Sequence, residues 1–162
     1  MHSGLIAWVL MVSLLSTTID ANGGSSRKSK AIIQELSDVK DWKKLIKTKT
    51  NVLIYFGNGK SSFQSKGILS VLQEAAELIK GIGTVAIADC AGEGKKLCKK
   101  VKASPAAGQY VLKHYNNGEF NKDYDRADRL SSIVNFMKDP TGDLPWEEDE
   151  TAKDVLHLPD LA

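Results

Sequence analysis

Apolar and polar residues alternate along the chain in blocks whose spacing predicts helices and strands. Two continuous apolar runs, at residues 51–56 and 84–88, predict strands that are buried on both faces of a sheet. Two further apolar stretches flank Asn116-Asn117-Gly118, which predicts a β-hairpin with strands at 110–115 and 119–124. Apolar residues at helical spacing predict a first helix that begins after Ser37 or Asp38. The same spacing predicts further helices at residues 65–80, 93–101 and 130–137.

The order of these segments restricts the fold. Residues 31–36 predict a short strand or turn, after which helices and strands alternate until the hairpin and a last helix. Alternation of this kind produces a sheet with helices on both faces, and the hairpin adds antiparallel strands to that sheet. The pattern therefore predicts an α/β domain with a mixed central sheet at residues 31–139.

The two ends of the chain have patterns that do not belong to this domain. The apolar run Leu5–Leu15 is too short to span a bilayer as a helix and suits the core of a signal peptide, residues 1–21. We expect a polar leader at 22–30, an acidic linker at 140–154, and the truncated start of a following domain at 155–162. A signal peptide implies a secreted or lumenal protein, with no membrane attachment after cleavage.

Composition narrows the class of function. The net charge of +2 gives no indication of nucleic-acid binding, although lysines concentrate between Arg27 and Lys49. The histidines stand far apart in the sequence, at positions 2, 114 and 157, and only two cysteines accompany them. This spacing matches no metal-binding motif, so we expect neither a metal nor another cofactor.

The stretch Val52–Phe63, which reads VLIYFGNGKSSF, presents a strand, a glycine-rich turn and then Gly59-Lys60-Ser61. This order suggests a phosphate-binding loop, but the full motif needs a glycine where Ile54 stands. We expect Ser61 or Ser62 to cap the helix that follows the turn. A secreted protein that binds a small ligand or nucleotide through Gly57–Ser62 is kept as one hypothesis.

Cys90 and Cys98 are the chemically most informative residues of the chain. In an oxidising compartment we expect them to pair, either as a structural disulfide between a strand end and the next helix or as a redox-active pair. The seven residues between them differ from the close spacing of catalytic thiols and favour the structural disulfide. Nearby lysines could stabilise a thiolate at Cys98 and keep the redox alternative open; they are Lys95, Lys96, Lys99 and Lys100.

Three segments carry a resemblance to a known family. Asp89-Cys90 after a strand, followed by LCKKV, resembles a cysteine pair that follows the third strand in protein disulfide isomerases. HYNNGEFNKDYDRADRLSSIVNFMKDP resembles the last hairpin and helix of that family, and PWEEDETAKDVLHL resembles an interdomain linker and the next strand. The chain resembles the N-terminal non-catalytic domain of the protein disulfide isomerase-related protein (PDIR) type, which implies a thioredoxin-like fold.

The resemblance also directs attention to a missing motif. Catalytic members carry Cys-x-x-Cys after the strand that corresponds to Val52–Phe56, whereas Ser61 and Gln64 stand at those positions here. Serine cannot replace the thiolate that disulfide exchange requires. We therefore expect that the chain is not an enzyme but a redox-inactive domain that supports protein folding by binding. A thiol–disulfide oxidoreductase that uses Cys90 and Cys98 is the alternative.

Partners and location follow from the same resemblance. It implies binding of unfolded client polypeptides or of acidic endoplasmic-reticulum chaperones of the calreticulin kind, which a lysine-rich helix could dock. The lumen of the endoplasmic reticulum is the expected location, although Pro159–Ala162 is not a KDEL-like tail and leaves secretion open. The candidate docking residues are Lys40, Lys43, Lys44 and Lys47.

Overall fold

The computed structural model describes residues 33–64 and 66–143. The expected signal peptide, the polar leader, most of the acidic linker and the start of a following domain therefore lie outside the described residues. None of the described helices has the length and apolar character that crossing a membrane requires.

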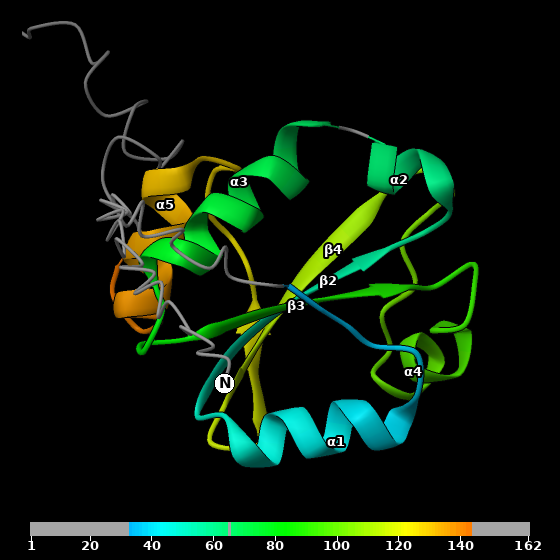
Figure 1. The fold of residues 1–162 in the computed structure, drawn as a ribbon, viewed down its shortest axis with the longest axis horizontal. Coiled ribbons are helices and arrows are strands. Elements are labelled where there is room, and N and C mark those ends of the chain that lie inside the picture. The colour runs from blue at the N-terminus through cyan, green and yellow to red at the C-terminus, as the bar shows by residue number, and fades with distance from the viewer. Residues whose placement is uncertain (1–32, 65, 144–162) are drawn as a thin grey trace, which may run out of the picture.

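Strands and helices alternate through most of the described chain (Figure 1). The strands are β1 (Gln34–Glu35), β2 (Asn51–Gly57), β3 (Thr84–Asp89), β4 (Tyr110–Asn116) and β5 (Glu119–Asp123). The helices are α1 (Val39–Thr48), α2 (Lys60–Gln64), α3 (Lys66–Leu78), α4 (Lys95–Lys100) and α5 (Leu130–Lys138).

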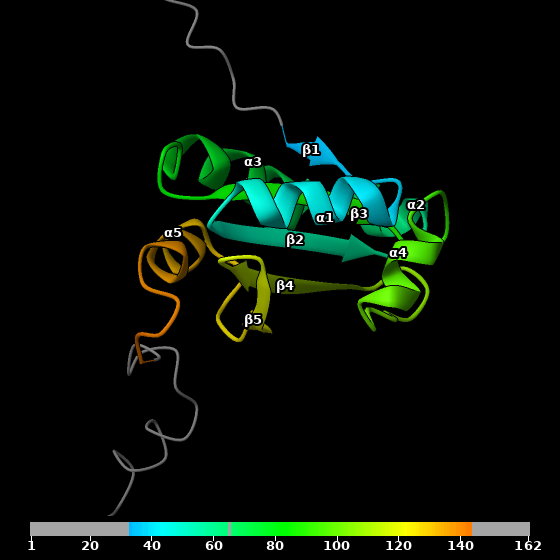
Figure 2. The same ribbon diagram turned by 90° about the horizontal axis from the view of Figure 1, so that it is seen from below.

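The strands form one mixed sheet in the order β1-β3-β2-β4-β5, which can be followed from top to bottom in Figure 2. β1, β3 and β2 run parallel, whereas β4 is antiparallel to β2 and β5 is antiparallel to β4. α1 and α4 cover one face of the sheet, and α3 and α5 cover the other (Figure 1). This arrangement confirms the predicted α/β class with a mixed sheet and helices on both faces.

The central strand β2 divides the hydrophobic core into two halves. The side chains of Val52, Ile54 and Phe56 pack in the half beneath α1 and α4. Leu53 and Tyr55 pack in the half beneath α3 and α5. All five residues are completely buried, which explains why the run is apolar at successive positions and does not alternate with polar residues.

Local sequence determines where the first helices begin. The Asp38 carboxylate accepts a hydrogen bond from the Asp41 backbone N–H at 2.8 Å, so Asp38, one of the two predicted caps, begins α1. The helix predicted at 65–80 corresponds to α3, whereas the short helix α2 at 60–64 was not predicted. Ser61 and Ser62 lie inside α2 and do not cap a helix, which corrects that expectation.

The hairpin between β4 and β5 turns at Asn117 and Gly118, whose φ angles are 50° and 85°. Positive φ at both central residues is characteristic of the type I′ turn, which suits the twist of a two-residue hairpin. The predicted hairpin is therefore confirmed. The strand register shifts between His114 and Tyr115, so the ladder between β4 and β5 is irregular there.

A buried polar network lies at the end of the sheet next to this hairpin. The Asn51 amide nitrogen donates to the Met137 carbonyl at 2.7 Å, which leaves the Asn51 amide oxygen to accept from Nε2 of His114 at 2.7 Å. Nδ1 of His114 then accepts from the Asn121 amide at 3.0 Å. Burial, with a smaller contribution from Lys122, lowers the pKa of His114 to about 4, so this fully buried ring is neutral near pH 7.

Candidate functional site

Two strand-to-helix junctions lie side by side at the carboxyl ends of the parallel strands β2 and β3. Gly57 and Asp89 pair at the last position of these strands, and the Cys90 N–H donates to the Gly57 carbonyl at 2.8 Å. The chain continues from the first junction into α2 and from the second into α4. Open α/β sheets place their ligands and reacting groups beyond the carboxyl ends of strands, so both junctions are candidate sites.

The second junction holds a disulfide between Cys90 and Cys98, whose Cα atoms are 5.6 Å apart. The predicted pairing of these residues is therefore confirmed. Cys90 directly follows β3 and is partly exposed, whereas Cys98 lies in α4 and is 3% exposed. Cys90 is consequently the partner that an external thiol can approach.

Close packing positions α4 against the end of β3. A Cβ on Gly94 would lie 2.8 Å from the Asp89 carbonyl oxygen, so only glycine allows the chain to pass this closely. Leu97 and Cys98 point into the core beneath α1 and α4. The remaining residues of α4 are exposed lysines, and such cations stabilise a nearby thiolate; they are Lys95, Lys96, Lys99 and Lys100.

The first junction is filled by packed side chains. Ser62 is buried, and its hydroxyl donates to the Gly59 carbonyl at 2.7 Å. The Tyr55 hydroxyl in turn donates to the Ser62 carbonyl at 2.7 Å. A Cβ on Gly57 would lie 2.5 Å from the Ser62 Oγ, so the end of β2 has no room for a larger residue. This junction is a tight turn stabilised by its own hydrogen bonds.

The two positions that the sequence analysis aligned with a missing Cys-x-x-Cys both lie at this first junction. Ser61 is exposed on α2, and Gln64 ends the same helix. The cysteines lie at the second junction, one strand away, and the hydrogen bond between Cys90 and Gly57 connects the two places. The structure therefore places the aligned positions and the disulfide at the same end of the sheet, beyond the carboxyl ends of β2 and β3.

The first junction is poorly suited to a phosphate. The Asp89 carboxylate accepts hydrogen bonds from the N–H groups of Gly59, at 3.3 Å, and Ala91, at 3.0 Å. These two N–H groups are therefore not available to a phosphate, and the negative charge of the Asp89 carboxylate repels an anion. Among residues 33–64 and 66–143, no cluster of three or more histidine, cysteine or acidic side chains could hold a metal ion.

Tyr110 contributes to this end of the sheet and was not singled out by the sequence analysis. Its ring stacks on Tyr55 with centroids 4.9 Å apart, and its hydroxyl donates to the Asp128 carboxylate. Burial, followed by the Asp128 carboxylate, raises the pKa of Tyr110 well above its usual range. Its position at the start of the predicted hairpin strand was visible in the sequence, but its partner Asp128 lies in a loop without regular periodicity.

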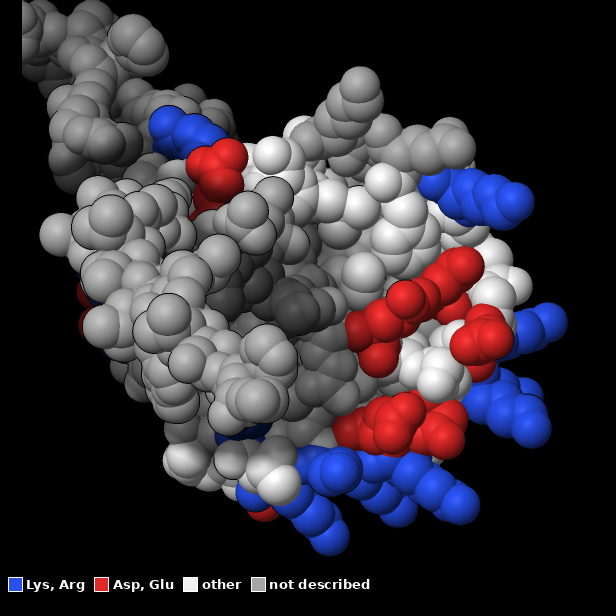
Figure 3. Space-filling view, in the orientation of Figure 1, with Lys and Arg blue, Asp and Glu red and all other residues white. Residues whose placement is uncertain are grey.

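The candidate docking lysines lie together on α1. Lys40, Lys43, Lys44 and Lys47 are all exposed. Figure 3 shows lysine and arginine side chains along the edge of the molecule where Figure 1 places α1, with acidic side chains directly beside them. The surface is therefore mixed in charge, and any acidic partner would have to fit between its negative groups.

Sequence comparison finds relatives over most of the chain. No protein-family model matches. The chain is 45% identical over 137 residues to protein disulfide-isomerase A5 of Mus musculus, which covers 83% of this chain and 26% of that protein. It is 40% identical over 157 residues to protein disulfide-isomerase A5 of Bos taurus, which covers 95% of this chain and 28% of that protein. The chain thus spans about a quarter of the length of these relatives.

Solved structures share the fold at low sequence identity. Human ERp44, form I, superposes with a TM-score of 0.57 at 16% identity, over 70% of this chain and 30% of that chain. The oxidised thioredoxin of Plasmodium falciparum superposes with a TM-score of 0.54 at 13% identity, over 68% of this chain and 100% of that chain. The thioredoxin-like fold expected from the resemblance is therefore confirmed.

The expectation that this chain is not an enzyme is contradicted. Its sequence relatives are named as protein disulfide-isomerases, which are enzymes, and its own cysteines form a disulfide. That expectation treated the absence of Cys-x-x-Cys after β2 as the loss of all thiol chemistry. The structure holds the chain's one cysteine pair at the neighbouring strand end, so the absence of that motif does not leave the chain without a disulfide.

Proposed function

We propose, from the chain's relationship to the protein disulfide isomerases, that it is a thioredoxin-like domain of that family whose chemistry is thiol–disulfide exchange at Cys90–Cys98. The observation that carries this proposal is the disulfide itself, which lies at the carboxyl end of β3 with Cys90 partly exposed. Exchange requires a sulfur that an incoming thiolate can reach, and Cys90 meets this condition.

The exchange proceeds in two substitutions at sulfur. A client thiolate attacks Sγ of Cys90, a mixed disulfide forms, and the Cys90–Cys98 bond breaks with Cys98 leaving as a thiolate. A second client thiolate then attacks the client sulfur of the mixed disulfide and releases Cys90 as a thiolate. The client loses two electrons and gains a disulfide, and the domain gains two electrons and becomes a dithiol. The reverse sequence reduces a client disulfide.

The surroundings of Cys98 support its role as the leaving group. Its helix carries four exposed lysines, and positive charge favours the thiolate that departs when the bond breaks. Cys98 itself is 3% exposed, so a competing attack at its sulfur is hindered and the mixed disulfide forms at Cys90. This difference in exposure makes Cys90 the sulfur that is attacked and Cys98 the sulfur that leaves.

An insulin-reduction assay tests the proposal. In the presence of dithiothreitol, we expect the chain to accelerate insulin precipitation and the Cys90→Ser variant to lose the acceleration. The Cys98→Ser variant should accumulate a mixed disulfide between Cys90 and a client cysteine, detectable by mass spectrometry. Ser61→Ala, at the aligned position of the other junction, is the matched control and should retain the rate. A rate for Cys90→Ser equal to that of the unaltered chain would exclude the proposed chemistry.

Location and partners complete the proposal. The relationship to protein disulfide-isomerase A5 supports action in the secretory pathway, in the lumen of the endoplasmic reticulum, on unfolded client polypeptides. It also supports the finer identification of this chain with the N-terminal domain of a longer protein of the PDIR type. Since the chain spans about a quarter of those relatives, the remaining domains would supply further activity.

An acidic chaperone is the second class of partner, and the exposed lysines of α1 are its candidate dock. Binding of a calreticulin-like chaperone should weaken as salt rises, because exposed charges are screened. The triple variant Lys43→Glu/Lys44→Glu/Lys47→Glu should weaken it at least tenfold in a calorimetric titration. Lys95→Glu/Lys96→Glu, which reverses charge on α4, is the control. Binding that survives the triple variant would exclude α1 as the dock.

A further inference from the structure

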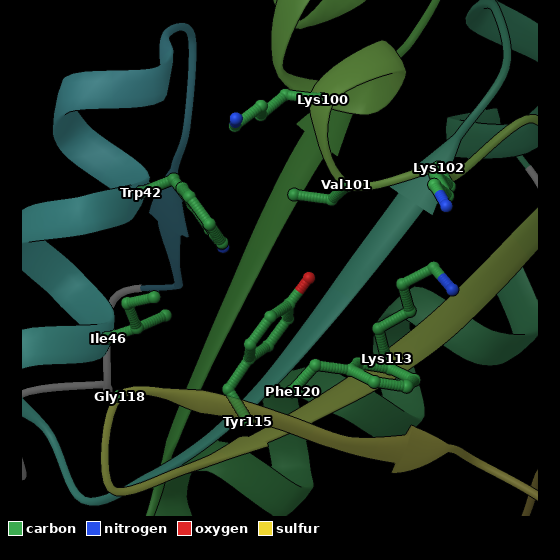
Figure 4. A pocket seen from close by; sticks show the side chains of 9 residues that line it. All are labelled: Trp42, Ile46, Lys100, Val101, Lys102, Lys113, Tyr115, Gly118 and Phe120. Atoms are coloured by element: carbon green, nitrogen blue, oxygen red, sulfur yellow. The ribbon is translucent and has the colours of Figure 1, made fainter.

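A groove opens on the side of the molecule covered by α1 and α4 (Figure 4). It has a volume of about 350 Å³, and its walls come from α1, the end of α4, β4 and β5. We call it the aromatic groove. Its apolar lining residues are Trp42, Ile46, Val101, Tyr115 and Phe120.

Three rings give the aromatic groove its character. Tyr115 lies between Trp42 and Phe120, and its ring centroid is 5.8 Å from each of theirs, in edge-to-face contact. Phe120 is 53% exposed, whereas Ile46 and Tyr115 are buried and Trp42 and Val101 are partly buried. The indole N–H of Trp42 is buried and faces the Tyr115 hydroxyl in Figure 4. The groove therefore offers three packed aromatic rings, of which that of Phe120 is exposed.

Lysines border these rings. Lys113 donates to the Asp123 carboxylate at 2.8 Å, and its Nζ lies 5.0 Å from the Phe120 centroid. Lys100 and Lys102 are exposed, and the described part of the chain shows no salt bridge for either. Lys102 has a φ of 55°, directly after the end of α4, where glycine is favoured. A lysine thus stands at the groove in a left-handed backbone conformation that residues with a side chain rarely adopt.

We propose that the aromatic groove binds the chain's own segment Leu144–Glu150, which reads LPWEEDE and follows the described residues. The segment joins one large ring, that of Trp146, to four consecutive carboxylates. The ring of Trp146 matches the exposed surface of Phe120, since aromatic pairs gain energy from edge and offset contacts. The carboxylates supply negative charge for Lys100 and Lys102, which have no salt bridge among the described residues.

The segment follows Gly142, which lies beside the loop after β5. The Arg126 guanidinium donates to the Gly142 carbonyl at 2.7 Å and lies 5.4 Å from the Phe136 centroid, so Gly142 lies near the end of β5. β5 is an edge strand of the described sheet, and its Phe120 lines the groove. Trp146 follows Gly142 by four residues, an extended reach of about 13 Å, and Glu150 by eight, about 27 Å.

This docking needs no thiol chemistry and therefore goes beyond the function proposed above. It makes the acidic segment an internal ligand of the domain. Acidic peptides from other proteins that use the same lysines would then have to displace it.

Fluorine NMR of the full chain labelled with 5-fluorotryptophan tests the proposal. The chain has three tryptophans, and single Trp→Phe variants assign their resonances. We expect the Trp146 resonance to differ from that of the labelled free peptide LPWEEDE. The variant Lys100→Glu/Lys102→Glu should move it to the free-peptide position, whereas the matched charge reversal Lys95→Glu/Lys96→Glu should leave it in place. Far-UV circular dichroism reports whether each variant is folded.

Two results would overturn the proposal. One is a Trp146 resonance that coincides with the free peptide in the unaltered chain. The other is a Trp146 shift that disappears on tenfold dilution, because the occupant would then be the segment of a second copy. A shift that is independent of concentration and sensitive only to the groove lysines supports docking within one chain.

Discussion

The two junctions at the carboxyl ends of β2 and β3 lie side by side but differ in packing and in the groups that they expose. The first is a glycine-rich turn whose polar groups bond to one another, with Ser62 and Tyr55 buried behind it. The second leaves Cys90 partly exposed and ties it to a buried partner on a lysine-rich helix. Gly57 and Asp89 stand at the same position of paired strands, so the sheet offers both junctions the same starting geometry.

The difference shows that position in a fold and chemistry at that position are separate properties. The resemblance places the reactive thiol of catalytic members just after β2, where this chain has the exposed Ser61 instead. The neighbouring strand end retains sulfur chemistry within one strand spacing, roughly 5 Å away. Asp89 connects the two, since its carboxylate accepts from both Gly59 and Ala91.

Substituting Gly57 is the strongest way to break the first junction. In Gly57→Ala the new Cβ would meet the Ser62 Oγ at 2.5 Å and the Tyr55 ring at 2.7 Å. We expect a loss of about 3 kcal/mol in the free energy of unfolding, measured by urea denaturation. Gly67→Ala in α3, where a Cβ meets nothing within 4 Å, is the control and should be stabilising or neutral. Equal effects of the two substitutions would show that the first junction is loosely packed.

Removing the disulfide tests the second junction. The double variant Cys90→Ser/Cys98→Ser should lose about 2.5 kcal/mol of stability on the chain-entropy model, since the closed loop is short. The same variant should lose insulin-reduction activity completely. Urea denaturation and the activity assay thus report two properties of one bond. Lost stability with retained activity would place the exchange chemistry outside this pair.

Acid pH probes the sheet at the end remote from both junctions. The pKa of His114 is lowered to about 4 in the folded chain and is near 6.5 unfolded, so the unfolded chain binds the proton first as pH falls. Stability from the neutral ring is complete above pH 7 and declines toward pH 4. Between pH 7 and 5 we expect a loss of about 2 kcal/mol in urea denaturation. His114→Gln should remove this component, and an unchanged pH profile would contradict it.

The link between the junctions is expected to give the smallest effect. Asp89→Asn keeps an oxygen that can accept from Gly59 and Ala91 but removes the charge that strengthens both hydrogen bonds. We expect about 1 kcal/mol of destabilisation and, because the nearby anion is gone, a faster attack of anionic thiolates at Cys90. Stopped-flow measurement of glutathione reduction of the disulfide checks the rate. A slower reduction would show that Asp89 positions Cys90 and does not repel the incoming thiolate.

Much of the fold could be predicted from the sequence because burial on two faces leaves a clear pattern. The runs that became β2 and β3 were found within one residue, and Asn117-Gly118 predicted the hairpin. The helix α2 was missed, because five residues are too few to establish helical periodicity. Its serines resembled caps in sequence, but only the structure shows that Ser62 bonds back to Gly59.

The candidate site was harder to predict because its parts come together through strand pairing. The sequence places Cys90 long after Gly57, and no local pattern reveals that their backbones share a hydrogen bond. The stacking of Tyr110 on Tyr55, and its hydrogen bond to Asp128, depend in the same way on the antiparallel register of β2 and β4. The cysteine pairing was predictable, since only two cysteines are present.

The outer strands of the sheet affect how such a domain behaves at high concentration. β1 has two residues, and β5 has five residues whose pairing with β4 shifts in register between His114 and Tyr115. A short or irregular edge offers few N–H and C=O groups in register to a strand from another molecule. Within the described sheet, neither edge is therefore a good template for intermolecular pairing. An exposed strand of another molecule therefore finds few backbone groups here with which to pair, and the domain resists edge-to-edge aggregation.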